Sequence, residues 1–241
     1  MILEISELSK NFGSLAALSK VSFQIEKGEI FGIAGPNGAG KSTLFNVIAG
    51  HYSPTSGKVR FDGHDITGLK PHRICGKGIG RTFQIPTTFH SLNVYDNLRA
   101  GTIFGGGSLD RLSQVIDFLD LSTRLQAPAT NLDLYTTKLV MLGTVLATDC
   151  KLLMLDEPMA GFSMVEIGRF VDLVRRINLE WGITVLIIEH LLDILVDLSN
   201  RLLILDNGQI IAVGHPPEVI QNPRVVEGYL GKRKGGHDAQ S

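Results

Sequence analysis

The sequence predicts an α/β fold built on a parallel sheet, and two observations lead to that prediction. First, the apolar run 29–34 ends at a glycine-rich loop, and a helix-like segment, 41–49, follows that loop directly and closes at Gly50. Second, the apolar runs 151–155 and 183–188 enclose a segment whose apolar residues recur at helical spacing, namely Ile167, Phe170, Val174, Ile177 and Trp181. Strands that alternate with helices are typical of a parallel sheet covered by helices.

The composition is that of an ordinary globular chain of 241 residues, 44% hydrophobic and 20% charged. A formal net charge of -1 provides no overall field that would recruit nucleic acid or anionic lipid. Cys75 and Cys150 lie far apart without metal-ligand spacing, and residues 1–10 lack the features of a signal peptide. We therefore expect a reduced, cytosolic chain. Its longest apolar runs, such as 183–188, are too short to span a membrane, so at a membrane it would dock onto other chains.

The segments outside this core are expected to add strands at the N-terminus and helices in the middle. Short strands are predicted at 3–5 and 21–25, and the run 59–61 meets a turn at Asp62 and Gly63. From 94 to 147 the pattern becomes helical, which indicates a helical insertion.

The C-terminal part is expected to contain a hairpin and a last helix. The runs 201–206 and 209–213 flank Asn207 and Gly208, the strongest short hairpin pattern. A proline at 216 begins the final helix, and the tail 231–241 is expected to be disordered.

The first candidate site is the loop between the run 29–34 and the helix 41–49. It satisfies G-x-x-x-x-G-K-[ST] in the strand-to-helix context that this motif requires. Its backbone N–H groups would surround the α- and β-phosphates of a nucleotide, Lys41 would reach the β- and γ-phosphates, and Ser42 would ligate Mg²⁺. The alternative, a glycine-rich turn with an exposed lysine, needs all these residues to coincide by accident. The predicted nucleotide-binding residues are Gly35, Pro36, Asn37, Gly38, Ala39, Gly40, Lys41, Ser42 and Thr43.

The second candidate site is a pair of carboxylates, Asp156 and Glu157, at the C-terminal end of the apolar run 152–155. Carboxyl ends of parallel strands are where such folds bind ligands, so this pair is expected beside the glycine-rich loop. Asp156 would hold Mg²⁺ through water, and Glu157 would polarise an attacking water as a general base. Alone, such a run is more often a strand leaving the core. Its pairing with the upstream loop favours the functional interpretation.

With these two sites the sequence resembles the ATP-binding cassette (ABC) family over nearly its whole length. The resemblance implies a P-loop NTPase core with a parallel sheet, an N-terminal antiparallel β subdomain and an inserted α-helical subdomain. It implies one ABC ATPase domain over 1–241, with the core and β subdomain at 1–85 and 148–230 and the helical insertion at 86–147. The chain would bind ATP and Mg²⁺ and hydrolyse ATP.

Three further residues acquire roles through the resemblance. Gln84 matches the family's Q-loop glutamine, which touches Mg²⁺ and water and reports to the membrane partner, so the implied metal ligands are Ser42, Asp156 and Gln84. His190 matches the switch histidine that contacts the γ-phosphate and holds the attacking water. Phe12 matches the aromatic that stacks on adenine, a contact worth about 1 to 3 kcal/mol in comparable sites. Outside the family, a surface glutamine, a capping histidine and a core aromatic are the ordinary interpretations.

Within the family, the stretches 80–86, 155–161 and 225–231 look most like subunits that power uptake of branched-chain amino acids and related amides, although lipopolysaccharide-export ATPases have a similar tail. This implies a peripheral subunit at the cytoplasmic face of the cell membrane. Its implied partners are transmembrane permease subunits, a second ABC ATPase subunit and, indirectly, an extracytoplasmic substrate-binding protein. No nucleic acid partner is implied.

The sequence departs from the family at the signature motif, usually Leu-Ser-Gly-Gly-Gln or Leu-Ser-Tyr-Gly-Gln. Here the aligned residues are Leu132, Asp133, Leu134, Tyr135 and Thr136. In the family this loop clamps the γ-phosphate bound by the opposite subunit, and two negative groups about 4 Å apart repel by about 4 kcal/mol at an effective dielectric of 20. Asp133 avoids that conflict if it turns to cap its own helix. Ser163 also stands where the family commonly has Asp or Asn for contacts across the dimer.

These departures suggest an asymmetric heterodimer, in which a partner cassette supplies a normal signature to this chain's nucleotide site. A non-transport cassette that acts on ribosomes or DNA is the first alternative. The chain argues against it, since it holds one cassette, no heptad run and no basic stripe. A regulatory cassette that binds ATP without hydrolysis is the second alternative, and the altered signature keeps it open.

Overall fold

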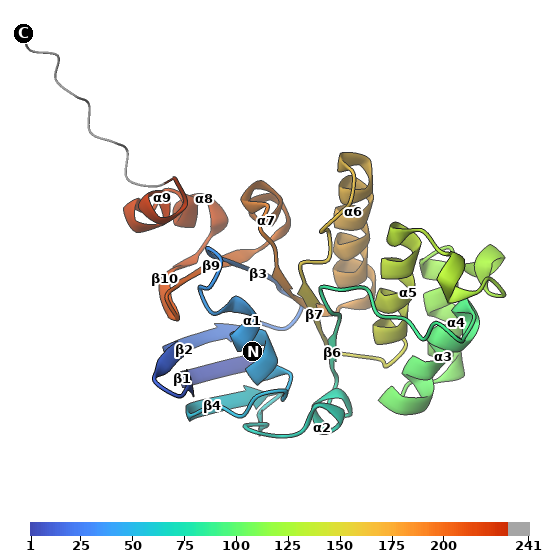
Figure 1. Ribbon diagram of the computed structural model, residues 1–241, viewed down its shortest axis with the longest axis horizontal. Coiled ribbons are helices and arrows are strands. Elements are labelled where there is room, and N and C mark those ends of the chain that lie inside the picture. Colours follow the sequence, from blue (N-terminus) through green and yellow to red (C-terminus); the bar gives the residue numbers. More distant parts are fainter. Residues whose placement is uncertain (231–241) are drawn as a thin grey trace, which may run out of the picture.

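The computed structural model describes residues 1–230, so the tail predicted to be disordered, 231–241, lies outside the described residues. The described chain forms two sheets with helices around them (Figure 1). The antiparallel sheet and the helices α3, α4 and α5 lie at opposite ends of the molecule (Figure 1). The predicted α/β class with a parallel sheet, an N-terminal antiparallel sheet and a helical segment is confirmed.

The larger sheet brings the candidate site residues to one edge. Its strands are parallel except for β10, and their order is β10 (Gln209–Gly214), β9 (Arg201–Asp206), β3 (Ile30–Ala34), β8 (Thr184–Ile188), β7 (Leu152–Asp156) and β6 (Ile79–Arg81). The three central strands, β3, β7 and β8, are buried along their whole length, which explains their continuous apolar runs. The P-loop, Glu157 and His190 follow the carboxyl ends of these three strands.

The smaller sheet is antiparallel, with the order β2 (Leu15–Ile25), β1 (Leu3–Phe12), β4 (Ser56–Phe61) and β5 (His64–Asp65). The sequence predicts only the first third of β1, because its later half is mostly polar and only partly buried. The strand nevertheless continues through pairing with β2, and this extension carries Phe12 to the end of the strand.

Helix α1 (Lys41–Ile48) is held between the two sheets. Its Leu44, Phe45 and Ile48 are completely buried in one apolar cluster with Phe31 of β3 and Leu3 of β1. Such close packing fixes the start of the helix, and therefore the loop before it, relative to both sheets.

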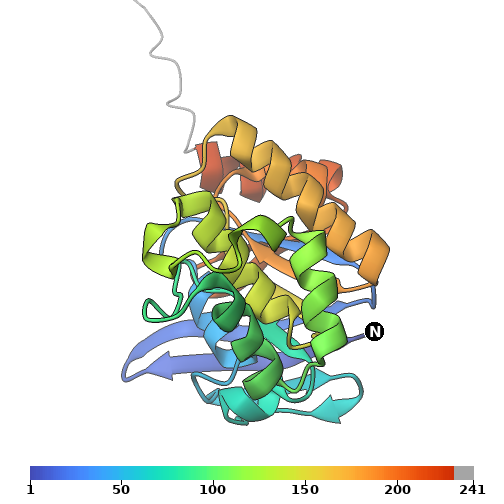
Figure 2. The same cartoon turned by 90° about the vertical axis from the view of Figure 1, so that its right-hand side faces the viewer.

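The opposite face of the large sheet is covered by α6 (Met164–Trp181) and α7 (Leu192–Leu198). Four of the predicted stripe residues of α6, Ile167, Phe170, Val174 and Ile177, are buried there. Beside them lie α3 (Val94–Gly105), α4 (Leu109–Phe118) and α5 (Leu134–Leu146), which face the viewer in Figure 2. The remaining elements are α2 (Pro71–Cys75), α8 (Pro216–Ile220), α9 (Pro223–Leu230) and two 3₁₀ turns (Ser122–Arg124 and Ala129–Asn131). Among residues 1–230, no helix has the length and apolar character needed to cross a membrane.

Candidate active site

The P-loop turns tightly between β3 and α1, and two of its glycines have no room for a side chain. Gly40 has φ 104°, and a Cβ atom there would lie 2.5 Å from the Ala17 carbonyl oxygen. A Cβ atom at Gly35 would overlap the Leu205 carbonyl oxygen. Because Gly40 is also the N-cap of α1 and has no side chain, the first-turn amides of the helix are left for an anion.

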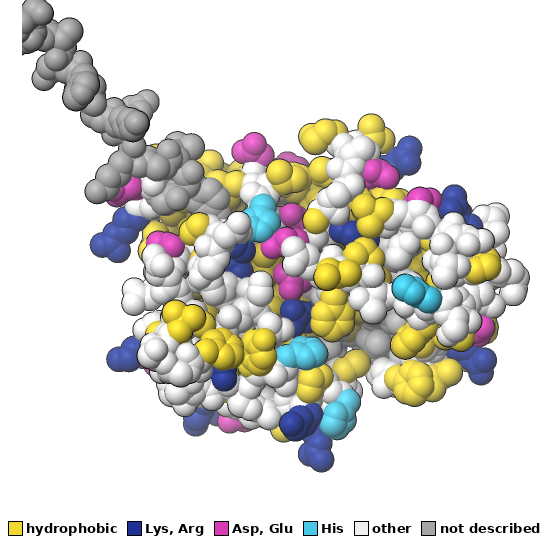
Figure 3. Space-filling view, viewed as in Figure 1, with side chains coloured by type: hydrophobic (Ala, Val, Ile, Leu, Met, Phe, Trp, Pro, Cys, Tyr) yellow, Lys and Arg dark blue, Asp and Glu magenta, His cyan; other side chains and the backbone are white. Residues whose placement is uncertain are grey.

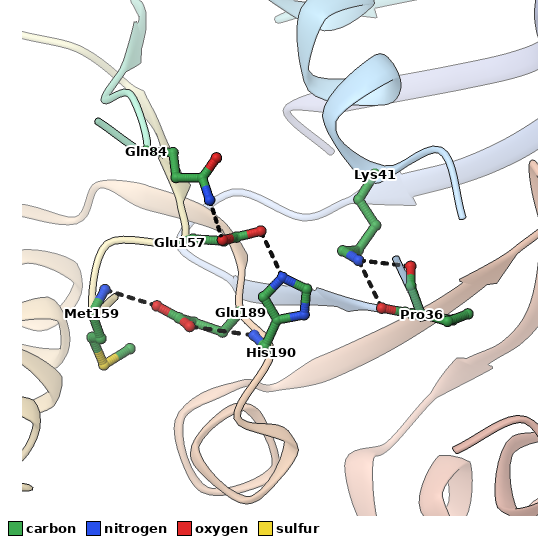
Figure 4. A network of polar contacts seen from close by, with 8 residues as sticks. Pro36, Lys41, Gln84, Glu157, Met159, Glu189 and His190 are labelled. Atoms are coloured by element: carbon green, nitrogen blue, oxygen red, sulfur yellow. Dashed lines mark hydrogen bonds and ion pairs between the residues drawn. The ribbon is translucent and has the colours of Figure 1, made fainter. Parts of the chain in front are cut away.

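Lys41 is curled back over this loop. Its Nζ donates to the carbonyl oxygens of Gly35 at 2.7 Å and Pro36 at 3.0 Å (Figure 4). Burial lowers the pKa of Lys41 below its ordinary value, while the nearby carboxylates of Glu157 and Asp156 act in the opposite direction. A buried cation beside open helix amides is an arrangement suited to a phosphate chain.

The P-loop lines a cavity of about 440 Å³ whose other walls include Phe12 and Glu157. The Phe12 side chain is 42% exposed at its rim and meets Tyr52 edge-on, with 5.3 Å between ring centroids. That exposure does not fit a core aromatic. The Lys10 Nζ lies 4.9 Å from the centroid of the Phe12 ring.

Glu157 is held by the two other predicted catalytic residues. Gln84 Nε2 donates to its Oε2 at 2.6 Å, and His190 Nε2 lies 2.8 Å from its Oε1 (Figure 4). An ionised carboxylate only accepts hydrogen bonds, so His190 presents Nε2–H to it. Glu157 has φ 47°, a backbone conformation that costs about 1 to 3 kcal/mol in residues other than glycine. In the space-filling view, acidic and histidine side chains gather in the middle of this face (Figure 3).

Asp156 lies beneath this group and is paired with Arg81. Arg81 Nη2 is 2.9 Å from Asp156 Oδ2, and its Nη1 donates to Asn46 Oδ1 at 2.8 Å. Burial raises the pKa of Asp156, and the Arg81 guanidinium opposes that rise. Arg81 engages one carboxylate oxygen, so Oδ1 is the oxygen left for a cation, directly or through water.

Mg²⁺ would be held by one residue of the cavity wall and two residues beside it, because Ser42 lines the cavity, Gln84 is hydrogen-bonded to Glu157 of the wall and Asp156 directly precedes Glu157. Ser42, Asp156 and Gln84 offer hydroxyl, carboxylate and amide oxygens, which hard cations prefer. Residues 1–230 contain no cluster of three His, Cys, Asp or Glu side chains that could hold a metal alone. Mg²⁺ commonly binds through one or two protein oxygens together with substrate phosphates.

Asp133, in the altered signature, caps its own helix. Its carboxylate accepts hydrogen bonds from the Thr136 backbone N–H at 2.7 Å and the Thr136 hydroxyl at 3.0 Å, at the N-terminus of α5. The backbone hydrogen bond holds the pKa of Asp133 below its ordinary value, against a smaller opposing effect of burial. Such a cap contributes about 1 kcal/mol to stability. One of the first-turn amides of α5, that of Thr136, is therefore already bonded to a negative group.

Ser163 has a comparable local role. It is the N-cap of α6, where its hydroxyl accepts from the Glu166 N–H at 3.4 Å and the Glu166 carboxylate accepts from the Ser163 N–H at 2.7 Å. This capping box explains a serine at that position through the chain's own structure.

Three charged residues near the site are missing from the sequence prediction. Arg81 binds Asp156, while Lys138 and Glu189 contact the segment that follows Glu157. Two of them are conspicuous in the sequence, because Lys138 is the single charge in the 13-residue helix α5 and Glu189 directly follows the buried strand β8. The contacts themselves join residues far apart in the chain, which no local pattern reveals.

The fold and the site together define a P-loop nucleotide-binding protein in which the Glu157 carboxylate lies in the wall of the P-loop cavity. The family profile described as ABC transporter matches residues 18–160, more than half of the chain. The chain belongs to the ABC transporter family.

Two curated relatives that match nearly the whole chain are described as branched-chain amino acid transport ATP-binding proteins. A protein of Archaeoglobus fulgidus described as "Probable branched-chain amino acid transport ATP-binding protein LivG" is 37% identical, covering 95% of each chain. The high-affinity branched-chain amino acid transport ATP-binding protein BraF of Pseudomonas aeruginosa is 31% identical, covering 96% of this chain and 98% of its own. Among solved structures, the ADP conformation of an ATP-binding cassette of an ABC transporter is 36% identical, with a TM-score of 0.88 over 96% of this chain and 99% of that one.

Proposed function

We propose that this chain is the subunit that binds and hydrolyses ATP to drive an ABC transporter. The observation that carries the proposal is the position of Glu157, held between Gln84 and His190 at the wall of the P-loop cavity. A carboxylate next to a phosphate site can take a proton from water, and hydrogen-bond partners on both sides hold it in place.

The proposed chemistry assigns each part of the site one task. Lys41 and the first amides of α1 bind the phosphates, and Phe12 stacks on the adenine. Mg²⁺, held by Ser42, Asp156 and Gln84 with the phosphates, would neutralise charge that develops on them. Glu157 accepts the proton of the attacking water, and His190, released from Glu157 by the incoming nucleotide, donates Nε2–H to the γ-phosphate.

The proposed cargo is a branched-chain amino acid or a related amide. The support is the printed function of relatives that match nearly the whole chain, and those names give a non-transport cassette no support. Cells that lack this chain should lose uptake of radiolabelled leucine, isoleucine and valine and regain it with the wild-type gene. Uptake of a basic amino acid serves as the control. Unchanged uptake of all three would refute branched-chain amino acids as the cargo, and uptake of a radiolabelled short-chain amide would then test the other half of the proposal.

The proposed permease contact is an apolar cavity of about 400 Å³ between α2, β6 and the helices α3 and α5. Phe83, Phe89 and Phe104 line it and are 45%, 55% and 82% exposed. Exposed aromatic side chains around a concave surface suit a protein partner, since such residues are enriched at interfaces. Arg81 also lines this cavity, so the same residue borders the permease contact and holds Asp156. A chain docked there would lie at the cytoplasmic face of the membrane, with a substrate-binding protein on the other side.

The proposed partner at the nucleotide site is a second, different cassette. Asp133 caps α5 and already bonds the Thr136 N–H, at the helix N-terminus where the family meets the γ-phosphate of the opposite subunit, so this chain would offer its partner an incomplete phosphate contact. We expect the purified chain alone to hydrolyse ATP slowly and the complex with a second cassette and permease to do so briskly. The measurement is phosphate release at equal chain concentration. Brisk, cooperative hydrolysis by the chain alone would overturn the heterodimer and leave the ATPase assignment standing.

A further inference from the structure

The segment 157–163, which joins Glu157 to the N-cap of α6, is clamped from two sides. It begins in a strained conformation at Glu157, φ 47°, and ends at Ser163. Strained backbone persists only where the surroundings fix it. The groups that fix this segment therefore bear on where the Glu157 carboxylate points.

Lys138 of α5 holds the segment from one side. Its side chain is buried, and its Nζ donates to the carbonyl oxygens of Pro158 and Ala160, each at 2.8 Å. The same ammonium group lies 4.9 Å from the centroid of the Phe162 ring. Burial lowers the pKa of Lys138, while Glu189 and Glu157 raise it.

Glu189, at the end of β8, holds the segment from the other side. Its carboxylate is buried, with Oε1 accepting from the Met159 N–H at 2.9 Å and Oε2 accepting from the His190 N–H at 3.3 Å (Figure 4). One carboxylate therefore touches both the segment after Glu157 and the backbone of the histidine that contacts Glu157.

Stabilisation of the fold alone does not explain why Lys138 and Glu189 are both charged and buried. A buried charge is costly unless it is fully bonded, and an apolar residue would pack the same space at lower cost. Here both charged groups form their hydrogen bonds with the backbone next to Glu157 and His190. Lys138 also belongs to α5, the helix that Asp133 caps.

We propose that Lys138 and Glu189 are positioning residues, which fix the segment 157–163 and thereby hold the Glu157 carboxylate at the wall of the P-loop cavity. The inference rests on the proposed ATP hydrolysis at this site.

The test uses the full chain assembled with its partner cassette and permease. Lys138→Met keeps an unbranched side chain that is one atom shorter and removes the three donors of the ammonium group. We expect turnover to fall by about 10²-fold, as a misplaced reacting group does, with ATP affinity changed by less than about threefold. Glu189→Gln keeps the shape of the side chain and one hydrogen-bond acceptor, so it should lower turnover less, by about tenfold, through a smaller misplacement of Glu157. Lys138→Arg should recover part of the loss, because it restores a cation with donors.

Two further measurements separate positioning from general stability. Hydrogen exchange of the Met159 and Ala160 amides should quicken in Lys138→Met without nucleotide, whether or not the wild-type complex hydrolyses ATP. Lys151→Met, at an exposed lysine paired with Asp62, is the matched control and should change neither exchange nor turnover. Unchanged exchange in the segment, or a parallel loss of melting temperature and ATP affinity that Arg does not rescue, overturns the proposal. A wild-type complex that releases no phosphate contradicts the proposed function instead.

Discussion

Replacing Glu157 by glutamine should lower ATP turnover of the assembled complex by about 10² to 10⁴-fold while ATP still binds. Glutamine has almost the same shape, but it cannot take a proton from water. It also cannot accept two hydrogen bonds from opposite sides without turning its own N–H₂ toward a donor, so Gln84 and His190 lose one of their contacts. The measurement is phosphate release under saturating ATP, together with nucleotide retained by the complex after rapid desalting.

The matched control for this change is Glu180→Gln. Glu180 is an exposed carboxylate on α6 that pairs with Arg176, remote from the P-loop cavity. The Glu180→Gln substitution should leave ATP turnover within about twofold of the wild-type value, since surface ion pairs contribute little to stability. If Glu157→Gln turns over ATP as fast as the control variant, another group accepts the proton and the assignment of Glu157 is wrong.

The parts of the site that lie in continuous motifs could be predicted from the sequence. The P-loop needs only a strand, a turn and a helix in succession, and its geometry follows from local glycine positions such as Gly40. Asp156 and Glu157 follow a strand that is buried on both faces, which makes an unbroken apolar run. The P-loop follows β3, and Glu157 follows β7. Because β3 and β7 are both parallel neighbours of β8, their carboxyl ends lie at the same edge of the sheet.

The contacts between those motifs could not be predicted in the same way. Arg81 and Asp156 are 75 residues apart, and Lys138 reaches a carbonyl 20 residues further on. A charge within an apolar helix shows that something binds it, but the binding group is set by packing. The extension of β1 to Phe12 has the same origin, since pairing with β2 rather than its own apolar pattern keeps it extended.

Asp133 illustrates an intermediate case. Its position at the start of a helical pattern permits both an N-cap and a group that faces a neighbouring subunit. The two differ only in the direction of one side chain, and the contact with Thr136 decides it in favour of the cap. The sequence could therefore predict that the signature is altered, but not that its carboxylate is already bonded to α5.

Replacing Lys41 by alanine should weaken ATP binding by about 10²-fold or more. Truncating one partner of a buried, hydrogen-bonded charge pair costs about 2 to 5 kcal/mol, and the phosphates would be the buried partner here. The lysine is already buried, so its desolvation takes place on folding and not on binding. Its ammonium group now donates to the Gly35 and Pro36 carbonyls, and it needs only to exchange those bonds for phosphate oxygens. ATP should lose more affinity than ADP, because Lys41 is assigned to both the β- and γ-phosphates.

Calorimetric titration of ATP and ADP into the complex measures this loss, with the exposed Lys58→Ala on β4 as the control for removing a positive charge. An ATP affinity within threefold of wild type would mean that the phosphates bind elsewhere.

Together with Glu157→Gln, the Lys41→Ala variant distinguishes loss of ATP binding from loss of hydrolysis. Lys41→Ala should lose turnover because ATP no longer binds, and excess ATP should restore part of it. Glu157→Gln should lose turnover with ATP bound, and excess ATP should restore none.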